Sequence, residues 1–111
     1  MRKKEAFDMQ LTPEQIAFVT KSDVVVQRQL DAYNARDLEG YLATHKSDAE
    51  QYMLHAGLLA SGHDAIRARM AERFNDPALH ARLVSRTVLG RIVVDHEFVT
   101  RTAPDGLMEI D

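Results

Sequence analysis

Apolar residues in the first third of the chain recur at the spacing of a helix. Asp23 interrupts this stripe and Ser22 could cap a new start, so the pattern allows one long helix or a break near residues 21–23. The preceding run Thr12-Pro13-Glu14-Gln15 is typical of a helix start, because threonine caps and proline suits the first turn. The apolar positions of the stripe are Ile16, Val19, Val26, Leu30 and Tyr33.

The middle of the chain changes from helical to alternating spacing. Asn34–Asp37 predicts a helix end followed by a new cap, with a short helix over residues 38–44. The pattern from Glu50 to His55 alternates and predicts a strand, and residues 58–61 predict a second short strand. A helix that starts at Gly62 then carries Ile66, Met70 and Phe74 on one face and ends at Asn75-Asp76-Pro77.

The last third predicts antiparallel strands. Residues 82–89 and 92–102 are the arms of a hairpin, and Gly90-Arg91 is its turn because glycine tolerates a positive φ. A further turn at residues 103–106 leads into a strand that begins at Leu107.

This order of elements predicts an α+β fold. The chain of 111 residues suits one domain, which we expect over residues 12–111 after a tail of residues 1–11. The net charge of −3 lacks the basic surplus that nucleic-acid binding needs, and no apolar run is long enough to cross a membrane. Without cysteine, disulfides and thiolate chemistry are excluded, and a cytoplasmic location is expected. The chain has no phosphate-binding loop, dinucleotide fingerprint or nucleophile elbow, so no cofactor is expected.

Several short segments resemble one known family in their order and spacing. The run from Val26 to Gly40, VQRQLDAYNARDLEG, resembles the first two helices of ketosteroid isomerase. Ser61-Gly62 with Ala65–Arg67 is similar to the start of that family's next helix, and Val93–Glu97 resembles a segment of SnoaL-like proteins. Over residues 24–102, the chain therefore resembles the nuclear transport factor 2-like superfamily.

The resemblance implies a cone-like curved antiparallel sheet packed against about three helices, with an apolar pocket inside the cone. It also implies a homodimer through the sheet face. Relatives continue beyond the equivalent of Asp111 with two strands that close the cone, so we expect a second copy to cover the edge of the strand from Ile92, with strand exchange as one way to do so.

Two positions depart from the isomerase pattern. Met53 stands where that enzyme has its aspartate base, and Gln29 stands where it has a tyrosine that donates to the oxyanion. Methionine cannot take a proton, and an amide is a far weaker acid than a phenol. The isomerase mechanism in its usual form is therefore not expected.

The candidate bases are two histidines on predicted strands. His55 lies two residues beyond Met53, so alternation puts both on one face. His96 shares a face with Phe98, while Asp95 and Glu97 share the opposite face, where a salt-bridge ladder with Arg86 is the simpler interpretation. The sequence leaves open which face lines the pocket.

The remaining candidates are hydrogen-bond donors. Tyr33 lies one turn after Gln29 and either offers its hydroxyl to a ligand or packs in the core. Tyr41 and Tyr52 are expected to pack, and His45 to lie on the surface with the other two histidines. No spacing motif predicts a metal site.

The sequence thus leaves three functions open. The first is a pocket protein, related to SnoaL-like proteins and steroid isomerases, that binds a small apolar metabolite through Gln29, Tyr33, Met53 and Phe98. The second is a proton-transfer enzyme of isomerase or cyclase type that uses His55 or His96. The third is a non-catalytic dimeric interaction module.

Overall fold

Three helices and two antiparallel sheets make up the described part of this computed structural model, which covers residues 13–103 and 106–110, with side chains for residues 21–102. The predicted α+β class is confirmed. None of the helices in these ranges is long and apolar enough to cross a membrane. The elements are α2 (Pro13–Ala35), α3 (Leu38–Ala43), β1 (Glu50–Met53), β2 (Gly57–Ser61), α4 (Gly62–Arg73), β3 (His80–Leu89), β4 (Ile92–Ala103) and β5 (Gly106–Ile110).

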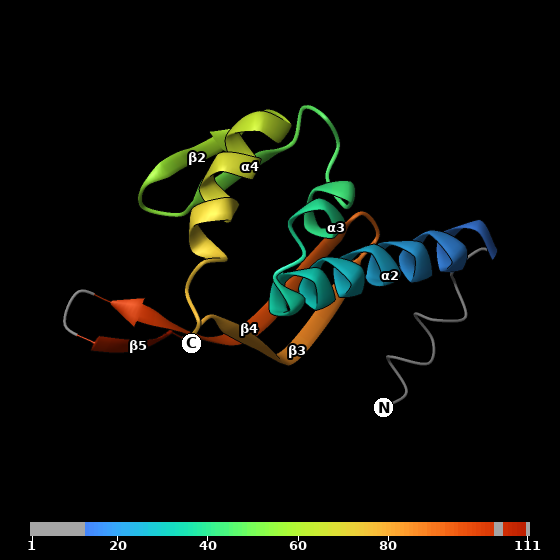
Figure 1. The fold of residues 1–111 in the computed structure, drawn as a ribbon. Helices are drawn as coiled ribbons and strands as arrows, with labels where there is room; N and C mark the ends of the chain where they lie inside the picture. The colour runs from blue at the N-terminus through green and yellow to red at the C-terminus, as the bar shows by residue number, and fades with distance from the viewer. Residues whose placement is uncertain (1–12, 104–105, 111) are drawn as a thin grey trace.

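Helix α2 is continuous through residues 21–23, which decides between the two alternatives that the sequence left open. Asp23 lies within the helix, and its carboxylate accepts a hydrogen bond from Arg86 on β3. The helix lies along the β3–β4 hairpin (Figure 1). Thr12, the expected cap, lies outside the described residues.

The end of α2 is fixed by Arg36, which has the left-handed φ of 58°. This conformation costs a non-glycine residue about 1 kcal/mol, so the surrounding contacts must hold it. The Arg36 guanidinium donates to the carbonyls of Asp76 and Leu79 at 2.8 and 2.7 Å. These bonds tie the end of α2 to the loop between α4 and β3.

The strands form two separate small sheets, where one continuous curved sheet was expected. One sheet pairs β1 with β2, and the other has the order β3-β4-β5. Strand β3 begins two residues earlier than predicted. The predicted final strand is confirmed, and it pairs with β4 from Val99 to Ala103, so it covers part of the edge that was expected to be open.

A β-bulge in β3 controls which side chains face the helices. The register of β3 on β4 shifts between Leu83 and Ser85, so Val84 has no partner in the ladder. The extra residue reverses the alternation, and both Leu83 and Arg86 therefore point toward α2. Without the bulge, Leu83 and Arg86 would point to opposite faces of β3.

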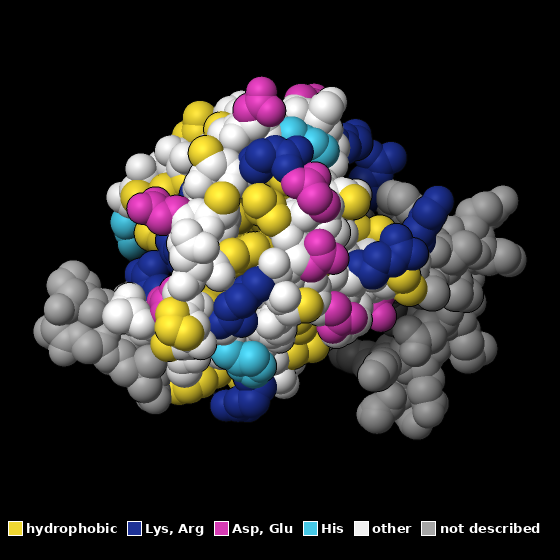
Figure 2. Space-filling view, in the orientation of Figure 1, with side chains coloured by type: hydrophobic (Ala, Val, Ile, Leu, Met, Phe, Trp, Pro, Cys, Tyr) yellow, Lys and Arg dark blue, Asp and Glu magenta, His cyan; other side chains and the backbone are white. Residues whose placement is uncertain are grey.

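The core lies between α2, α3, α4 and the start of β3. Ile66 and Leu79 are fully buried in it. The face in Figure 2 carries lysines and arginines scattered among acidic and hydrophobic side chains, without one extended basic patch. The buried cluster is Ala32, Tyr41, Leu42, Ala60, Ile66, Met70, Phe74 and Leu79.

Candidate functional site

A partly open cavity of about 150 Å³ lies between α2 and β4. One wall comes from α2, where positions three and four apart share a face, and the other from β4, where alternate residues do. Tyr41 of α3 completes it. The lining residues are Val26, Gln29, Leu30, Tyr33, Tyr41, Asp95 and Glu97. The inward face of β4 is thus the one that carries Asp95 and Glu97.

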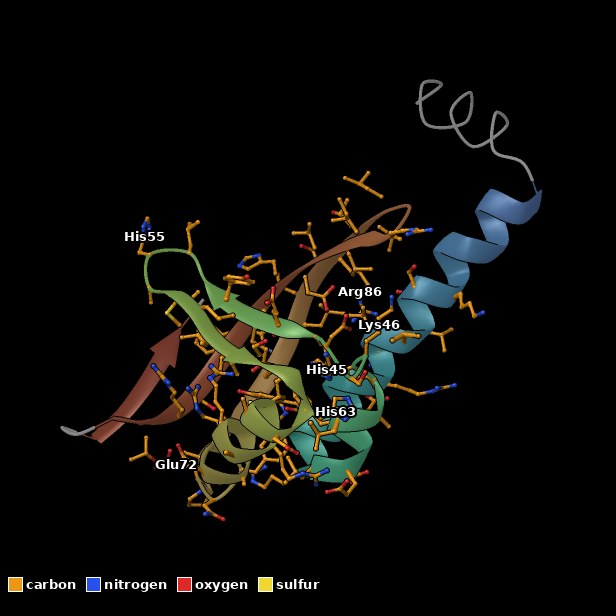
Figure 3. All side chains as sticks on the ribbon, turned by 90° about the horizontal axis from the view of Figure 1, so that it is seen from above. His45, Lys46, His55, His63, Glu72 and Arg86 are labelled. Atoms are coloured by element: carbon orange, nitrogen blue, oxygen red, sulfur yellow. The ribbon has the colours of Figure 1, made fainter. Side chains whose placement is uncertain are left out.

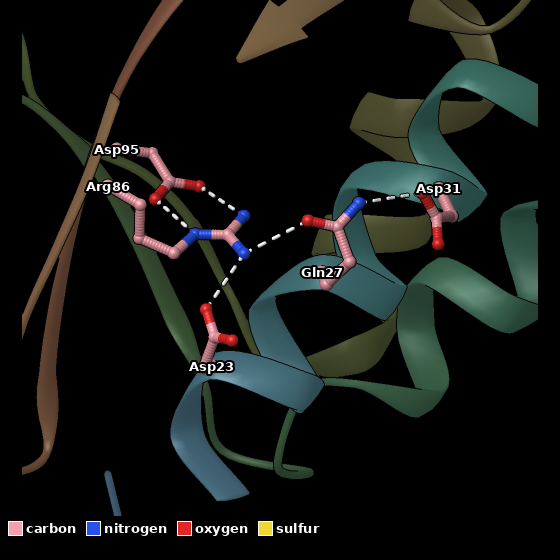
Figure 4. A network of polar contacts seen from close by, with 5 residues as sticks. All are labelled: Asp23, Gln27, Asp31, Arg86 and Asp95. Carbon is pink, nitrogen blue, oxygen red and sulfur yellow. Dashed lines mark hydrogen bonds and ion pairs between the residues drawn. The ribbon is translucent and has the colours of Figure 1, made fainter. Parts of the chain in front are cut away.

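Asp95 is held by a charged network at one side of the cavity (Figure 4). Arg86 donates to both of its carboxylate oxygens, at 2.7 and 3.0 Å. The same guanidinium donates to Asp23 and Gln27, each at 3.0 Å, and Gln27 donates to Asp31. The predicted pairing of Arg86 with Asp95 is confirmed, and these hydrogen bonds raise the pKa of Arg86. Asp95 therefore has Arg86 as its counter-ion, and the pair has a structural role.

Glu97 lies on the same face but has different surroundings. It is half-buried, and the described residues provide no hydrogen bond or ion pair to its carboxyl group. Burial raises its pKa, the nearby charge of Asp95 raises it further, and Arg86 partly opposes both. A carboxyl group in a cavity whose pKa is raised is a candidate for taking up and returning a proton.

Two tyrosines face this carboxyl group across the cavity. Their rings lie 6.2 Å apart, and both meet Phe74 edge to face, at 5.6 Å from Tyr33 and 5.7 Å from Tyr41. Burial raises the pKa of both phenols, so they keep their protons and can donate. The Tyr41 hydroxyl accepts from Gln51 at 3.0 Å, which leaves its own proton for another acceptor.

Gln29 is positioned by a histidine that the sequence did not single out. Nδ1 of His45 lies 2.9 Å from the Tyr41 carbonyl, which can only accept, so this nitrogen carries the proton. Nε2 of His45 then accepts from the Gln29 amide at 3.1 Å. The carbonyl of His45 accepts in turn from His63 (Figure 3). His45 therefore orients an amide on the cavity wall.

The structure places two of the predicted pocket residues at the cavity. Gln29 and Tyr33 share one face of α2, as their spacing predicted. Their part in ligand binding stays a prediction.

The other predicted site residues lie away from the cavity. Met53 ends β1 with half of its surface exposed, and His55 lies in the exposed turn that follows, at the far tip of the β1–β2 hairpin (Figure 3). His96 and Phe98 point to the outer face of β4, where Phe98 packs under Arg82. These four residues do not line this cavity, because β1 and β2 form a separate hairpin and β4 turns its odd-numbered residues inward. Their part in ligand binding or catalysis stays a prediction.

Sequence reasoning missed Glu97, Tyr41 and His45 as members of this site. A signal for Glu97 existed, since Asp95 and Glu97 occupy alternate positions of a predicted strand whose flanking residues are apolar. No sequence signal links His45 to Gln29, because sixteen residues separate them. Tyr52, expected to pack, is instead exposed and donates to Glu50. Among the side chains that the structure describes, no three histidine or acidic residues converge as metal ligands would.

Comparison with known proteins identifies a domain family and several similar folds. Residues 26–109 match the SnoaL-like domain family, and no curated protein matches the chain. An uncharacterised cystatin-fold protein from Novosphingobium aromaticivorans is 25% identical, with a TM-score of 0.70 over 79% of this chain and 81% of its own. A protein of unknown function from Nostoc punctiforme with a cystatin-like fold is 17% identical, with a TM-score of 0.55 over 89% and 74%. Aln2 from a Streptomyces species is 24% identical, with a TM-score of 0.56 over 90% and 75%.

Proposed function

Because the chain belongs to the SnoaL-like domain family, whose model spans most of it, we propose that the cavity binds a small ring-bearing carbonyl compound and moves a proton on it. The observation that carries this proposal is Glu97, a half-buried carboxyl group without a described partner, on a wall opposite two protonated tyrosines. The aromatic wall favours a ring, and the small volume of the cavity disfavours a larger substrate.

The proposed reaction is an isomerisation. In a carbonyl compound with a β,γ double bond, the Glu97 carboxylate removes a proton from the carbon next to the carbonyl. The electron pair of that C–H bond forms a new carbon–carbon double bond, and the π pair of the carbonyl moves to its oxygen, which gives a dienolate. Tyr33 or Tyr41 donates a hydrogen bond to the enolate oxygen that forms. Protonated Glu97 then returns the proton to the γ-carbon of the dienolate, which restores the carbonyl and shifts the double bond into conjugation with it, so no co-reactant is needed.

Solvent exchange tests this proposal directly. We expect the full chain to accelerate deuterium exchange at the α-carbon of small cyclic ketones such as cyclopentenone and cyclohexenone, followed by NMR. Glu97→Gln should slow that exchange by about 10²-fold, the usual contribution of a general base. Glu72→Gln, an exposed glutamate on α4, is the matched control and should change nothing. Exchange that persists in Glu97→Gln would remove Glu97 from the mechanism.

A second proposal concerns the outer face of the β3–β4 hairpin. We infer that this face binds a second copy of the chain, because four large apolar side chains on it are each about half exposed. They are Val84, Leu89, Ile92 and Val94, at 48, 60, 61 and 56% exposure. Self-association would bury them and leave the cavity, which lies on the other side of β4, open to ligand.

A further inference from the structure

Three arginines gather beside the two tyrosines, at the side of the site away from Arg86. Arg69 and Arg73 lie one turn apart on α4, and Arg101 lies on β4 on the same inward face as Asp95 and Glu97. All three are half-buried. Arg69 connects to the cavity through Gln51, which accepts from the guanidinium at 2.8 Å and donates to the Tyr41 hydroxyl at 3.0 Å.

This arginine cluster, defined as Arg69, Arg73 and Arg101, has no compensating anion among the described residues. Among the described residues, Arg67 and Arg86 form ion pairs, and neither of these arginines is a member of the cluster. The acceptors of Arg69 are a neutral amide and a thioether. The Nε atom of Arg101 is buried and has no acceptor among the described residues.

The three charges also act on one another and on the tyrosines. Burial lowers the pKa of Arg69, and the nearby charges of Arg73 and Arg101 lower it further. Burial raises the pKa of Tyr33, while all three guanidinium groups oppose that shift. The cluster therefore concentrates positive charge around the phenol of Tyr33, in a place where water is partly excluded. Charged groups that are partly shielded from water are normally paired with an opposite charge. These three guanidinium groups have no such counter-ion among the described residues.

We propose that Arg69, Arg73 and Arg101 form a subsite for an anionic group, a carboxylate or a phosphate, at one end of the molecule that the cavity binds. This proposal rests on the proposed function only in that the cavity takes a small ring-bearing ligand. Planar guanidinium groups match both anions through paired N–H donors. The tyrosine rings would contact the ring of the ligand, and the buried Nε of Arg101 would gain its missing acceptor.

Three probes of similar size separate charge from shape. Benzoate and phenyl phosphate carry the two anions, and benzamide has the shape of benzoate without its charge. We titrate each into the full ¹⁵N-labelled chain and follow the Nε–H signals of the arginines by NMR. A saturable shift of the Arg101 signal with benzoate or phenyl phosphate, at an affinity at least about tenfold above that for benzamide, is expected. Whichever anion binds more tightly identifies the group. Equal affinity for benzamide, or no saturable binding of either anion, would overturn the subsite.

Variants locate the binding. Arg101→Gln and Arg73→Gln should each weaken the preferred anion by about tenfold, because each removes a charged donor. Arg28→Gln, an exposed arginine on α2, makes the same change of net charge and should leave affinity within about twofold. Equal losses in Arg28→Gln would show a general electrostatic effect and would contradict the subsite. If Arg101→Gln does not fold, as judged by circular dichroism, the test of the subsite rests on Arg73→Gln, because the side chain of Arg73 is partly exposed.

Failure here is distinguishable from failure of the proposed chemistry. Glu97→Gln should keep anion binding or strengthen it, because it removes a negative charge from the cavity, while it slows proton exchange. Anion binding without any Glu97-dependent exchange would support the subsite and reject the base. Glu97-dependent exchange without anion preference would do the reverse.

Discussion

Asp95 and Glu97 are two residues apart on one face of β4, yet they have different electrostatic surroundings. Arg86 donates to both oxygens of Asp95, whereas burial and the charge of Asp95 raise the pKa of Glu97. Of two carboxyl groups in one cavity, one is thus held by a guanidinium group and the other has no hydrogen-bond partner among the described residues. The effects of Glu97 and of the partner of Asp95 can each be measured with a single substitution.

The pKa of Glu97 makes stability depend on pH. Below about pH 4, folded and unfolded chains both hold the proton, so Glu97 costs the folded state nothing. As the pH rises through the raised folded-state pKa, the unfolded chain ionises more easily and stability is lost. Glu97→Gln should therefore be more stable than the wild type at pH 7 and equal to it near pH 4. Urea unfolding at both pH values checks this, and a gap that is the same at both would contradict it.

Arg86 should be among the most sensitive residues of the sheet. Its side chain is 11% exposed and that of Asp95 is 12% exposed, so Arg86→Met leaves a nearly buried carboxylate without its partner. We expect a loss of about 3 kcal/mol in the free energy of unfolding, measured with urea at pH 7. Arg82→Met removes the same charge from the outer face of the same strand and should cost less than about 1 kcal/mol. Similar losses in both variants would show that the network has no special role.

At the scale of elements, α2 takes the place of a neighbouring strand at the edge of β3. The Asn34 amide donates to the carbonyl of Ala81 and accepts from its N–H, both at 2.8 Å. These backbone groups point away from β4 and would otherwise lack a partner in the ladder. One side chain with a donor and an acceptor thus docks the helix on the sheet that carries Glu97.

Because Asn34 docks α2 on β3, we predict that a substitution of nearly the same size at this position will destabilise the folded protein. Asn34→Asp keeps the acceptor but loses the donor, and it places a carboxylate oxygen against the Ala81 carbonyl. We expect a loss of about 2 kcal/mol, measured by urea unfolding. Asn75→Asp, on an exposed asparagine after α4, introduces the same charge and should stay within about 0.5 kcal/mol of the wild type. A loss in Asn34→Asp no larger than in Asn75→Asp would contradict this account.

At the scale of the whole molecule, the two faces of the β3–β4 hairpin differ in kind. The inner face carries the charged network and the cavity, and the outer face carries half-exposed apolar side chains. An apolar face on one side of a half-covered sheet suits association with another copy. The ligand site and the proposed dimer interface are therefore on opposite sides of the same two strands.

Sedimentation tests the self-association. We expect the full chain to be a dimer at micromolar concentration and Val94→Lys to be a monomer, because a lysine would bury its charge in the interface. Val24→Lys is the control, since Val24 is 45% exposed on α2 and away from that face. A wild-type monomer at these concentrations, or equal dissociation by both variants, would reject the outer face as the interface.

The sequence by itself determined the elements and their order, because hydrophobic spacing is a local property. It predicted the helices, the hairpin with its turn at Gly90 and the final strand, and it placed Gln29 and Tyr33 on one helix face. The pairing of Arg86 with Asp95 followed from strand alternation across that hairpin.

Only the tertiary structure decided which side of each strand faces the cavity. The separation of β1–β2 into its own sheet depends on contacts between distant segments, and it puts Met53 and His55 away from the cavity. Packing of β4 against α2 turns Asp95 and Glu97 inward and His96 outward. Burial raises the pKa of Glu97 and leaves the Nε atom of Arg101 without an acceptor among the described residues, and it likewise depends on how the elements pack. A strand pattern fixes two faces, but only packing against α2 makes one of them the inner face.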